Sequence, residues 1–579
     1  MLRTHTNGEL DIAEIKKDVA LAGWVGARRD HGGVIFIDLR DRYGLTQIVF
    51  NPDNKQFKEA DKLRREDCIL VNGIVRARPK NMENPSLTTG KVEVLVKNLE
   101  ILNKSEVPPL EVDDRIEAGE DVRLKYRYLD LRRPIMQKRL ELRHNAVTAA
   151  REFFNKNNFL EISTPMLVKS TPEGARDYVV PSRVHPGKLY ALPQSPQLYK
   201  QILMIAGFDR YYQTPICLRD EDLRSDRQPE HMQLDFEMSF VTSEDIRNFV
   251  EDLYKHIFKK VLNVDIKDFP IFTYKEAMDR FGTDKPDIRF GLELTDVTEV
   301  VKKSDFGVFK EAEKVRCINP DQDLSRKDLD KYTDFCTSAG AKGMAWMRVT
   351  DNGLESNIVK FFSPEVQKEL LKITKAKKGS TLMFIADKEK KVNDILSRLR
   401  LKLRDDLKLA KNDDFKFCWV KDFPLFAWNE DDDRWEPEHH MFSMPKPEFV
   451  KDLEKRPGEV IGDLWDITLN GIELGSGSIR VTVPELQERI MKMIGMTKEE
   501  ANAKFGFLLD AYKYGGPPHG GMGLGLDRTI ALMCGINDIR EVIAFPKTKA
   551  AECPMDGCPT DVDLDQLKEL NIKLDVKKK

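Results

Sequence analysis

The sequence predicts a multidomain α+β protein. Its 579 residues exceed the size that one hydrophobic core normally supports, so we expect roughly three or four domains. Residues 1–107 contain short β-branched runs separated by turn residues, whereas helical and strand patterns alternate from about residue 140 onwards. Chemically distinctive motifs thin out at about residue 284 and resume at about residue 415, which indicates an inserted domain.

Residues 1–107 predict a small closed β-barrel. Five runs carry the β-branched and aromatic residues typical of strands, namely VALAGWVGARRD, GVIFIDLRD, LTQIVFNP, CILVNGIVRAR and KVEVLVKNLEIL. A helical stretch, NKQFKEADKLRRED, interrupts them. Five strands fit the oligonucleotide-binding barrel, or OB-fold, which is the common five-stranded case.

The other segments follow from changes in composition. Residues 108–140 are dense in charge and poor in apolar periodicity, which is typical of a hinge with a short helix. Residues 141–283 begin with a long amphipathic helix, and residues 284–414 are rich in Lys, Asp and Glu with their own strand and helix signals. Motifs resume over residues 415–555, and residues 556–579 form an uninformative C-terminal extension.

Net charge and hydropathy narrow the class of protein. The 94 basic and 97 acidic residues give a net charge of −3, so bulk charge does not indicate a nucleic-acid partner, although local basic patches can still bind one. No run approaches the roughly 20 apolar residues of a membrane helix. The start, MLRTHTNGEL, lacks the basic-then-apolar pattern of a secretory signal. We therefore expect a cytoplasmic protein without a membrane partner.

The eight cysteines are scattered, and only Cys553 and Cys558 lie close together. No second Cys or His pair stands nearby at the spacing of a zinc site. We therefore expect reduced structural thiols here rather than a metal site.

A strictly alternating strand provides the first chemical signal. Its polar face, opposite an apolar core face, contains His231, Gln233, Asp235, Glu237 and Ser239. The preceding loop is densely charged and includes Arg219, Asp220, Glu221, Asp222, Arg224, Asp226 and Arg227. Two antiparallel strands with such a loop predict a platform for an anionic ligand. The alternative is a solvated hairpin with paired surface charges.

The segment DITLNGIELGSGSIR predicts a hairpin that turns at Asn470-Gly471. Asp466 and Glu473 flank the turn, so both carboxylates can face one point. Paired oxygen ligands suit a Mg²⁺ ion carried by nucleotide phosphates. The glycines that follow either leave room for a ligand or mark a bulge.

A third segment, GGMGLGLDRTIALMCGI, places Gly520, Gly521, Gly523 and Gly525 before a helix. Gly-rich turns before helices often approach phosphates. The spacing fits neither a P-loop nor a dinucleotide-binding fingerprint. Arg528, directly after the glycines, is the distinguishing residue.

These three stretches, in this order, resemble the class II aminoacyl-tRNA synthetases. Pro165 in FLEISTP is similar to their motif 1, Arg219 in CLRDEDLR to motif 2, and Arg528 in GLGLDR to motif 3. Within that class, QSPQLYK and STPEGARDY resemble the bacterial aspartyl enzymes. The match covers roughly residues 1–555.

The resemblance implies an anticodon-binding barrel, a hinge, and an antiparallel-sheet catalytic domain split by an inserted α/β domain of the GAD type. It also implies a homodimer through motif 1. The inserted domain is similar to one in a tRNA amidotransferase subunit.

The resemblance also implies the reaction. The carboxylate of L-aspartate attacks the α-phosphate of ATP, and the terminal hydroxyl of tRNA-Asp then attacks the mixed anhydride. Arg219, Arg528 and Glu473 would be catalytic, and Asp466 with Glu473 would hold Mg²⁺. The implied ATP-binding residues are Arg219, Asp220, Glu221, Gln228, His231, Glu473, Gly525, Leu526, Asp527 and Arg528. Such a site works by positioning and charge stabilisation and needs no protein nucleophile.

An acidic substrate side chain needs fixed positive charge, and a guanidinium can hold a carboxylate through two hydrogen bonds. Arg480 is the candidate, with Lys200 beside it. Asp235 would receive the substrate ammonium. The full expected aspartate-binding set is Glu173, Ser195, Gln197, Lys200, Arg219, Asp235, His439, His440 and Arg480.

On the barrel, Phe36 is expected to stack an unpaired tRNA base, unless it is core instead. Polar residues around it would read the anticodon, namely Arg28, Gln47, Arg78 and Glu93. His31 stands where strictly tRNA-Asp-specific relatives typically carry Leu, and the loop with Asn81 and Met82 also differs. The resemblance therefore indicates the relaxed type that also charges tRNA-Asn, whose product an amidotransferase converts.

Two positions depart from the family pattern: Met441 follows the two histidines where a proline is common, and His231 replaces a frequent Phe against adenine. The alternatives are a strictly tRNA-Asp-specific enzyme, an asparagine or lysine enzyme, and an inactive RNA-binding paralogue. The large insertion and the basic pair Arg480 and Lys200 disfavour an asparagine or lysine enzyme. An inactive paralogue would be expected to lose Arg219, Arg528 or Glu473, and all three are present.

Overall fold

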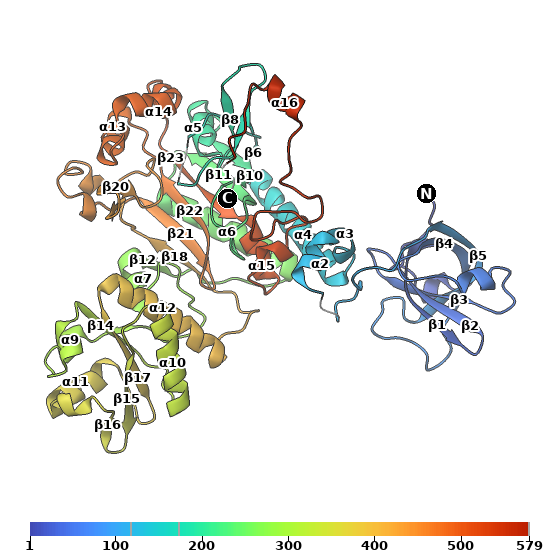
Figure 1. Ribbon diagram of the computed structural model, residues 1–579, viewed down its shortest axis with the longest axis horizontal. Helices are drawn as coiled ribbons and strands as arrows, with labels where there is room; N and C mark the ends of the chain where they lie inside the picture. Colours follow the sequence, from blue (N-terminus) through green and yellow to red (C-terminus); the bar gives the residue numbers. More distant parts are fainter. Residues whose placement is uncertain (116–117, 172–173, 577–579) are drawn as a thin grey trace. The chain divides into compact units, whose positions relative to one another are not determined.

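The computed structural model describes residues 1–115, 118–171 and 174–576 (Figure 1). The chain forms two compact units, residues 1–143 with 540–561 and residues 144–539 with 562–579. The first unit thus combines an N-terminal and a C-terminal part of the chain. Among the described residues, none of the helices has the length and apolar character that a membrane span requires.

The expected N-terminal barrel is confirmed. Its strands close in the order β1-β2-β3-β5-β4. They are β1 (Asp18–His31), β2 (Val34–Arg40), β3 (Leu45–Phe50), β4 (Cys68–Ala77) and β5 (Val92–Asn103). Ile35, Ile37 and Leu39 of β2 are fully buried in the core, and the alternate residues lie on the outer face. The helical stretch expected between the strands is only one turn, α1 (Phe57–Ala60).

A buried ionic cluster joins the helices after the barrel to the C-terminal segment of the same unit. The helices are α2 (Glu120–Lys125), α3 (Arg127–Asp130) and the start of α4 (Pro134–Lys156). Arg127 donates to the backbone oxygens of Arg540, Ile543 and Ala544 at 2.9–3.0 Å. Arg123 forms two hydrogen bonds, of 2.8 and 2.9 Å, with the Glu541 carboxylate. These contacts satisfy backbone oxygens that burial would otherwise leave unpaired.

The second unit is built on a nine-stranded sheet with the order β12-β18-β21-β22-β23-β11-β9-β6 and β10 paired to β11. The sheet is antiparallel except where β12 meets β18 and β6 meets β9. Its strands are β6 (Leu160–Glu161), β9 (Arg210–Gln213), β10 (Ile216–Leu218), β11 (Glu230–Ser239), β12 (Ile271–Thr273), β18 (Phe417–Lys421), β21 (Leu464–Leu469), β22 (Ile472–Ile479) and β23 (His519–Gly525).

Helices accompany this sheet. They are α5 (Gln197–Ile205), α6 (Ser243–Leu262), α7 (Tyr274–Phe281), α13 (Pro484–Met493), α14 (Lys498–Tyr512) and α15 (Leu526–Met533). Helix α6 begins at a reciprocal cap between Thr242 and Asp245, and Ile246, Val250 and Leu253 form its buried stripe. Smaller elements are β7 (Val179–Pro181), β8 (Leu189–Ala191), β19 (Phe426–Asn429), β20 (Arg434–Pro437) and α16 (Leu564–Glu569).

Between β12 and β18 the chain forms a second, five-stranded sheet with the order β13-β14-β17-β15-β16. Its strands are β13 (Thr295–Asp296), β14 (Lys314–Ile318), β15 (Ala345–Thr350), β16 (Gly353–Glu355) and β17 (Thr381–Asp387). Its helices are α8 (Thr298–Val301), α9 (Gly307–Glu311), α10 (Arg326–Ser338), α11 (Pro364–Ile373) and α12 (Glu389–Asp406). Met383 and Ile385 enter one hydrophobic cluster and Leu382 and Phe384 the other, so β17 is apolar throughout because both of its faces are covered.

Two arginines join the two ends of the insertion, at residues 287–292 and 400–411, and we call this junction the neck. Arg400 of α12 donates to four backbone oxygens, those of Asp287, Phe290, Gly291 and Leu292, at 2.8–3.0 Å. Arg289 donates to the backbone oxygen of Lys411 at 2.8 Å. The two ends of the insertion therefore lie side by side. The limits of the individual domains, including residues 284–414 for the inserted domain, stay predictions from the sequence.

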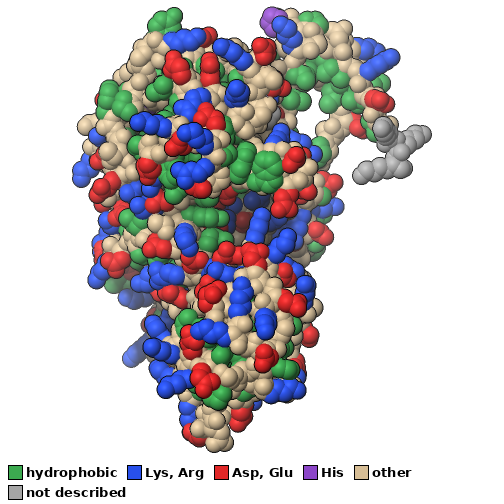
Figure 2. All heavy atoms as spheres, turned by 90° about the vertical axis from the view of Figure 1, so that its left-hand side faces the viewer, with side chains coloured by type: hydrophobic (Ala, Val, Ile, Leu, Met, Phe, Trp, Pro, Cys, Tyr) green, Lys and Arg blue, Asp and Glu red, His purple; other side chains and the backbone are tan. Residues whose placement is uncertain are grey.

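The surface carries closely mixed charges. Figure 2 shows Lys and Arg side chains interspersed with Asp and Glu side chains over the face in view. This mixture agrees with a net charge of −3 drawn from nearly equal numbers of both signs.

Candidate active site

A cavity of about 590 Å³ opens over the three adjacent strands β11, β23 and β22. Most of the expected site residues line it. They are Ser195, Gln197, Lys200, Arg219, Glu221, Gln228, His231, Asp235, His439, His440, Glu473, Arg480, Gly525, Asp527 and Arg528. Segments more than 300 residues apart in the sequence thus supply one cavity.

The glycines of GGMGLG form strand β23 itself, and the interpretation as a Gly-rich turn before the helix is wrong. A Cβ on Gly521 would lie 2.3 Å from Oε2 of Glu237, and one on Gly523 would lie 2.8 Å from Oε1 of Gln233. Positions 521 and 523 of the strand are glycine where polar side chains of β11 lie across it. Glycine here makes space for the site.

Arg480, at the end of β22, is buried and has an acceptor for each of its five N–H groups. Nε and Nη2 donate to Oε1 and Oε2 of Glu237 at 2.8 and 3.1 Å. Nη2 also reaches the backbone oxygen of Gly521 at 3.1 Å. Nη1 lies 2.8 Å from Oγ of Ser478 and 2.7 Å from Nε2 of His440. The guanidinium is therefore fixed in place before any substrate arrives.

Glu237 is the functional residue that sequence reasoning did not include in the site. Burial raises its pKa, but the charges of Arg480 and Lys200 outweigh burial and hold the pKa well below its usual range. Its Oε1 also lies 2.9 Å from Nδ1 of His519, whose Nε2 is 2.8 Å from the Tyr512 hydroxyl. The signal was present, because Glu237 shares the polar face of β11 with Asp235.

Asp235 and Lys200 form the other buried pair, with Nζ of Lys200 2.7 Å from Oδ1 of Asp235. Burial raises the pKa of Asp235 to about 6, although the Lys200 charge opposes the rise. Among the described residues, Oδ2 of Asp235 and Nε2 of Gln197 are buried without a hydrogen-bond partner. One unpaired acceptor and one unpaired donor match the ammonium and carboxylate groups of an amino acid.

At the opposite end of the cavity, His231 lies near Arg219 and Arg528. Burial and the charges of these two arginines lower the pKa of His231 to about 3. The imidazole is therefore neutral and presents an uncharged ring. Arg528 donates from Nη1 to the backbone oxygen of Glu473 at 3.0 Å, and Arg219 donates from Nε to that of Gln194 at 3.4 Å.

Asp466 and Glu473 lie on the neighbouring strands β21 and β22. Burial and the adjacent Glu473 charge raise the pKa of Asp466 well above its usual range. Its Oδ1 has no hydrogen-bond partner among the described residues. Nζ of Lys285 stands 3.4 Å from Oε2 of Glu473, a neighbour that the sequence did not predict. Two oxygen donors with an unpaired atom fit a hard divalent cation.

Of the other expected ATP-site residues, Asp527 lines the cavity, whereas Asp220 and Leu526 do not. Leu526 is buried in the core, and Asp220 pairs with Arg176 at 3.3 Å. Oδ2 of Asp527 accepts a hydrogen bond from the backbone N–H of Met232 at 2.8 Å, which joins α15 to β11. Glu173 lies outside the described residues.

Of the residues expected to bind RNA, Phe36 and Gln47 are partly exposed on the barrel, whereas Arg78 and Glu93 are buried. Phe36 is only partly buried and is absent from the core cluster, so the alternative that it is barrel core is wrong. Arg29, not Arg28, pairs across the strands with Phe36, whereas Arg28 forms an ion pair with Asp61. Residues that face each other across a strand pair share a face of the sheet.

Polar side chains beside Phe36 form a connected network. Arg29 bonds Asp38 at 2.6 and 2.7 Å, and Nε2 of Gln47 donates to Glu93 at 2.7 Å. Arg78 is buried and donates to the backbone oxygen of Val92 at 3.1 Å.

Of the residues expected to discriminate between tRNAs, His31 lies beside Phe36. The rings of His31 and Phe36 are 6.2 Å apart. Asn81 and Met82 are exposed, and Asn81 adopts a positive φ of 69°. Exposed side chains next to a partly buried ring suit contact with an unpaired base.

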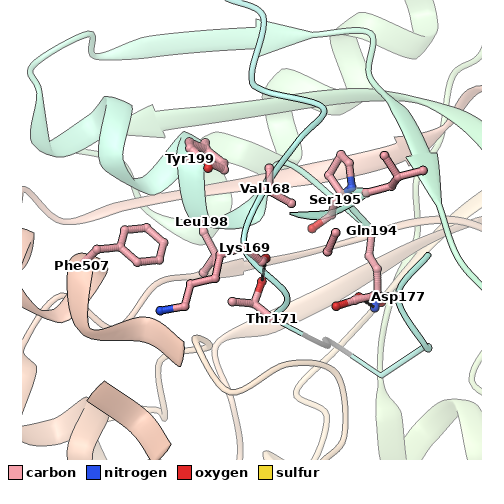
Figure 3. Close-up of a pocket in the computed structure, with 12 residues that line it drawn as sticks. Val168, Lys169, Thr171, Asp177, Gln194, Ser195, Leu198, Tyr199 and Phe507 are labelled. Carbon is pink, nitrogen blue, oxygen red and sulfur yellow. Dashed lines mark hydrogen bonds between the residues drawn. The ribbon is translucent and has the colours of Figure 1, made fainter. Parts of the chain in front are cut away.

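A second cavity of about 190 Å³ shares Gln194 and Ser195 with the first (Figure 3). Leu198 and Phe507 give it an apolar wall, and Lys169 and Asp177 are its charged residues. Nε2 of Gln194 donates to Oδ1 of Asp177 at 2.5 Å. This cavity has no arginine among its described lining residues, whereas Arg219, Arg227, Arg480 and Arg528 line the larger one.

Comparisons with known proteins agree with this geometry. The sequence model of the family described as tRNA synthetases class II (D, K and N) matches residues 119–549, and that of the OB-fold nucleic acid binding domain matches residues 19–102. The chain is 51% identical to the aspartate–tRNA(Asp/Asn) ligase of Caldanaerobacter subterraneus, over 99% of this chain and 98% of that protein. It is 48% identical to the aspartate–tRNA ligase of Ruminiclostridium cellulolyticum, over 99% and 98%.

Solved structures share the fold. An asparaginyl-tRNA synthetase from Pyrococcus horikoshii, complexed with asparaginyl-adenylate, aligns with a TM-score of 0.59 at 21% identity and covers 95% of this chain and 99% of its own. A putative aspartyl-tRNA synthetase from Leishmania major aligns with a TM-score of 0.59 at 18% identity, over 94% of both chains. The chain therefore belongs to the class II tRNA synthetases of the D, K and N group, and is an ATP-dependent aminoacyl-tRNA ligase.

Proposed function

We propose that this chain is an aspartate–tRNA ligase that activates L-aspartate with ATP and transfers it to the 3′ end of tRNA-Asp and of tRNA-Asn. The observation that carries the proposal is the buried pair Arg480 and Lys200 at one end of the cavity. Two fixed cations there recognise a side-chain carboxylate. The same two cations repel the ammonium of lysine. The neutral side-chain amide of asparagine carries no charge to compensate them.

The substrate ammonium is assigned to Oδ2 of Asp235, and the reacting carboxylate to the region between Gln197 and Arg219. Arg219 then stabilises charge on the α-phosphate, and Arg528 holds the γ-phosphate. The neutral ring of His231 stacks on adenine. No side chain has to act as a nucleophile, because the substrate carboxylate itself attacks phosphorus.

Asp466 and Glu473 would hold Mg²⁺. The ion would neutralise charge on the phosphate oxygens of ATP when bound. Lys285 would share Glu473 with the ion, and the charge of this lysine helps keep the Glu473 carboxylate ionised.

The outer face of the barrel is assigned to the anticodon, with Phe36 and His31 stacking on bases and the Arg29–Asp38–Gln47–Glu93 network reading their edges. Relaxed tRNA specificity is supported by relatives named Asp/Asn ligases, such as those of Caldanaerobacter subterraneus and Brachyspira hyodysenteriae. We extend the proposal to a cytoplasmic homodimer whose aspartyl-tRNA-Asn passes to a tRNA amidotransferase.

The first test is ATP–pyrophosphate exchange with each amino acid in turn. Exchange with aspartate is expected, and exchange with none would favour an inactive RNA-binding paralogue. Arg480→Leu should abolish aspartate-dependent exchange while ATP binding persists. Normal aspartate affinity in that variant would contradict the pocket assignment.

The second test is aminoacylation of purified tRNA-Asp and tRNA-Asn. We expect both to accept aspartate, and His31→Leu to lower kcat/KM for tRNA-Asn relative to tRNA-Asp. Charging of tRNA-Asp alone by the unaltered chain would favour the strictly specific alternative.

A further inference from the structure

A short loop near the end of the first unit brings two thiols together. Cys553 and Cys558 face each other in an isolated antiparallel bridge, in which the N–H of Cys553 donates to the oxygen of Cys558 at 2.8 Å. The N–H of Gly557 donates to the oxygen of Cys553 at 2.8 Å, and Gly557 has a φ of +78°. This tight turn, which glycine accommodates without strain, fixes both cysteines on neighbouring backbone positions.

Asp556 adds a third donor to the pair. One ligand atom each from Cys553, Asp556 and Cys558 lies within 4.8 Å of the others. Oδ1 of Asp556 also accepts the backbone N–H of Cys558 at 3.0 Å, so the carboxylate is anchored to the loop. Sulfur at about 2.3 Å and oxygen at about 2.0 Å from a tetrahedral ion lie about 3.5 Å apart from each other. A shift of about 1 Å therefore closes the set around one ion.

We propose that Cys553, Asp556 and Cys558 form a structural binding site for a divalent cation of the zinc class, with water as the fourth ligand. Two sulfurs select a thiophilic ion over Mg²⁺ or Ca²⁺. The sequence argued against a metal because a second Cys or His pair was missing. The turn supplies the missing donor from within the Cys-x4-Cys segment itself.

The charges in the loop favour a cation over a reactive thiol. Burial and the hydrogen-bonded Asp556 carboxylate raise the pKa of Cys558, so this thiol is a poor nucleophile. A hydrogen bond from the backbone of Cys558 and another from the Cys553 thiol lower the pKa of Asp556. A cation binds the thiolates, so its binding would release the thiol protons. Binding should therefore weaken as the pH falls.

The site would secure the C-terminal part of the first unit. Cys553 is buried, with 5% of its surface exposed, whereas Cys558 is only half-buried. In the adjoining turn, the N–H of Thr548 donates to the oxygen of Glu552 at 2.8 Å, and the N–H of Ala551 donates to the oxygen of Thr548 at 3.0 Å. An ion would thus join the buried Cys553 to the more exposed Asp556 and Cys558 of the same loop.

The test is a Co²⁺ titration of the full-length, untagged, fully reduced chain without oxygen. We expect one equivalent to produce the near-ultraviolet sulfur-to-cobalt charge-transfer band, and Zn²⁺ to remove it. Oxygen ligands such as Asp466 and Glu473 do not give this band. Cys553→Ser and Cys558→Ser should abolish it, and Asp556→Asn should weaken binding by about tenfold or more. Cys68→Ser, a half-buried thiol of the barrel, is the matched control and should keep the band.

Aspartate-dependent exchange should stay at the level of the unaltered chain in every variant, which shows that loss of the band is not loss of folding. A second measurement is alkylation of Cys558 by iodoacetamide, which Zn²⁺ should slow in the unaltered chain and leave unchanged in Cys553→Ser. Absence of the band from the reduced chain would overturn the proposal. Its persistence in both cysteine variants would do the same.

Discussion

At the scale of single residues, the site is set by how acceptors are distributed around Arg480. All five of its N–H groups are engaged, so a substrate carboxylate has to replace an acceptor rather than occupy a vacant donor. Glu237, Ser478 and Gly521 belong to the central strands, whereas His440 belongs to the segment before them. His440 is therefore the acceptor that the substrate can displace at least cost. Burial and the Arg480 charge keep its pKa well below the usual range, so the departing imidazole is neutral.

The first prediction concerns pH. Because burial raises the pKa of Asp235 to about 6, the carboxylate is ionised above this pH and protonated below it. Only the ionised form attracts the substrate ammonium. At saturating MgATP, kcat/KM for aspartate should fall about tenfold between pH 7 and pH 5 while kcat changes less. Steady-state exchange kinetics measure both, and a flat kcat/KM profile would refute the assignment.

The second prediction concerns Glu237. Glu237→Gln removes the negative partner of two buried cations, Arg480 and Lys200. Because buried charge is then uncompensated, the free energy of unfolding should fall by about 3 kcal/mol. Urea unfolding followed by tryptophan fluorescence measures the loss. Glu454→Gln is the control, because its partner Arg489 lies at the surface and such pairs contribute less than about 1 kcal/mol.

At the scale of elements, β23 separates two polar strands and has glycine at positions 521, 523 and 525 of one face. The pairing of Asp235 with Gly523 on one side and of Ser476 with Gly523 on the other brings both functional strands to one cavity. A side chain at Gly521 or Gly523 would occupy the space in which Glu237 or Gln233 of β11 lies. The strand thus acts as a spacer, and glycine is required where side chains of β11 cross it.

The third prediction compares two glycines. Gly521→Ala places a methyl group 2.3 Å from Oε2 of Glu237 and should disrupt the Arg480 pair, with loss of aspartate-dependent exchange. Gly506→Ala in α14 meets its nearest atom at 3.9 Å and should stabilise the helix by about 0.5–1 kcal/mol. Exchange activity and thermal midpoints distinguish the two. Equal behaviour of both variants would contradict the spacer role.

The sequence was informative where periodicity is strict and where charge chemistry is specific. Alternation along β11 placed His231 and Asp235 on one face, and the apolar runs predicted all five barrel strands. Sequence could not reveal that Arg28 turns away, because a register irregularity between Val25 and Arg28 decides which arginine faces Phe36. Lys285 was missed for a different reason, since its contact with Glu473 spans 188 positions and leaves no local pattern.

At the scale of the whole molecule, the first compact unit is completed by residues 540–561. Arg123, Arg127 and Arg139 have their carboxylate or backbone partners in that segment. The last residues of the chain, from 562 onwards, contribute none of these contacts among the described residues. The unit should therefore tolerate loss of residues 562–579 but not of residues 540–561.

The fourth prediction follows from this arrangement. A chain that ends at Ile539 should expose the hinge helices to protease, because Arg123, Arg127 and Arg139 lose the partners that residues 540–561 supply. A chain that ends at Asp561 should be as resistant as the full chain. Limited proteolysis with mass spectrometry locates the cuts. Equal cleavage of both truncated chains within residues 118–140 would contradict the prediction.

The closed neck of the inserted sheet has a consequence for folding kinetics. β12 and β18 pair in parallel, with Ile271 opposite Trp419, although the whole insertion separates them in the chain. Closing so long a loop costs about 2 kcal/mol more entropy than closing a ten-residue one. Once the insertion folds, Arg400 and Arg289 bring its two ends together, and the loop that remains is short. During synthesis, β12 would thus pair with β18 only after the insertion has folded. Arg400→Ala, which weakens the neck, should slow refolding of the large sheet more than it speeds unfolding.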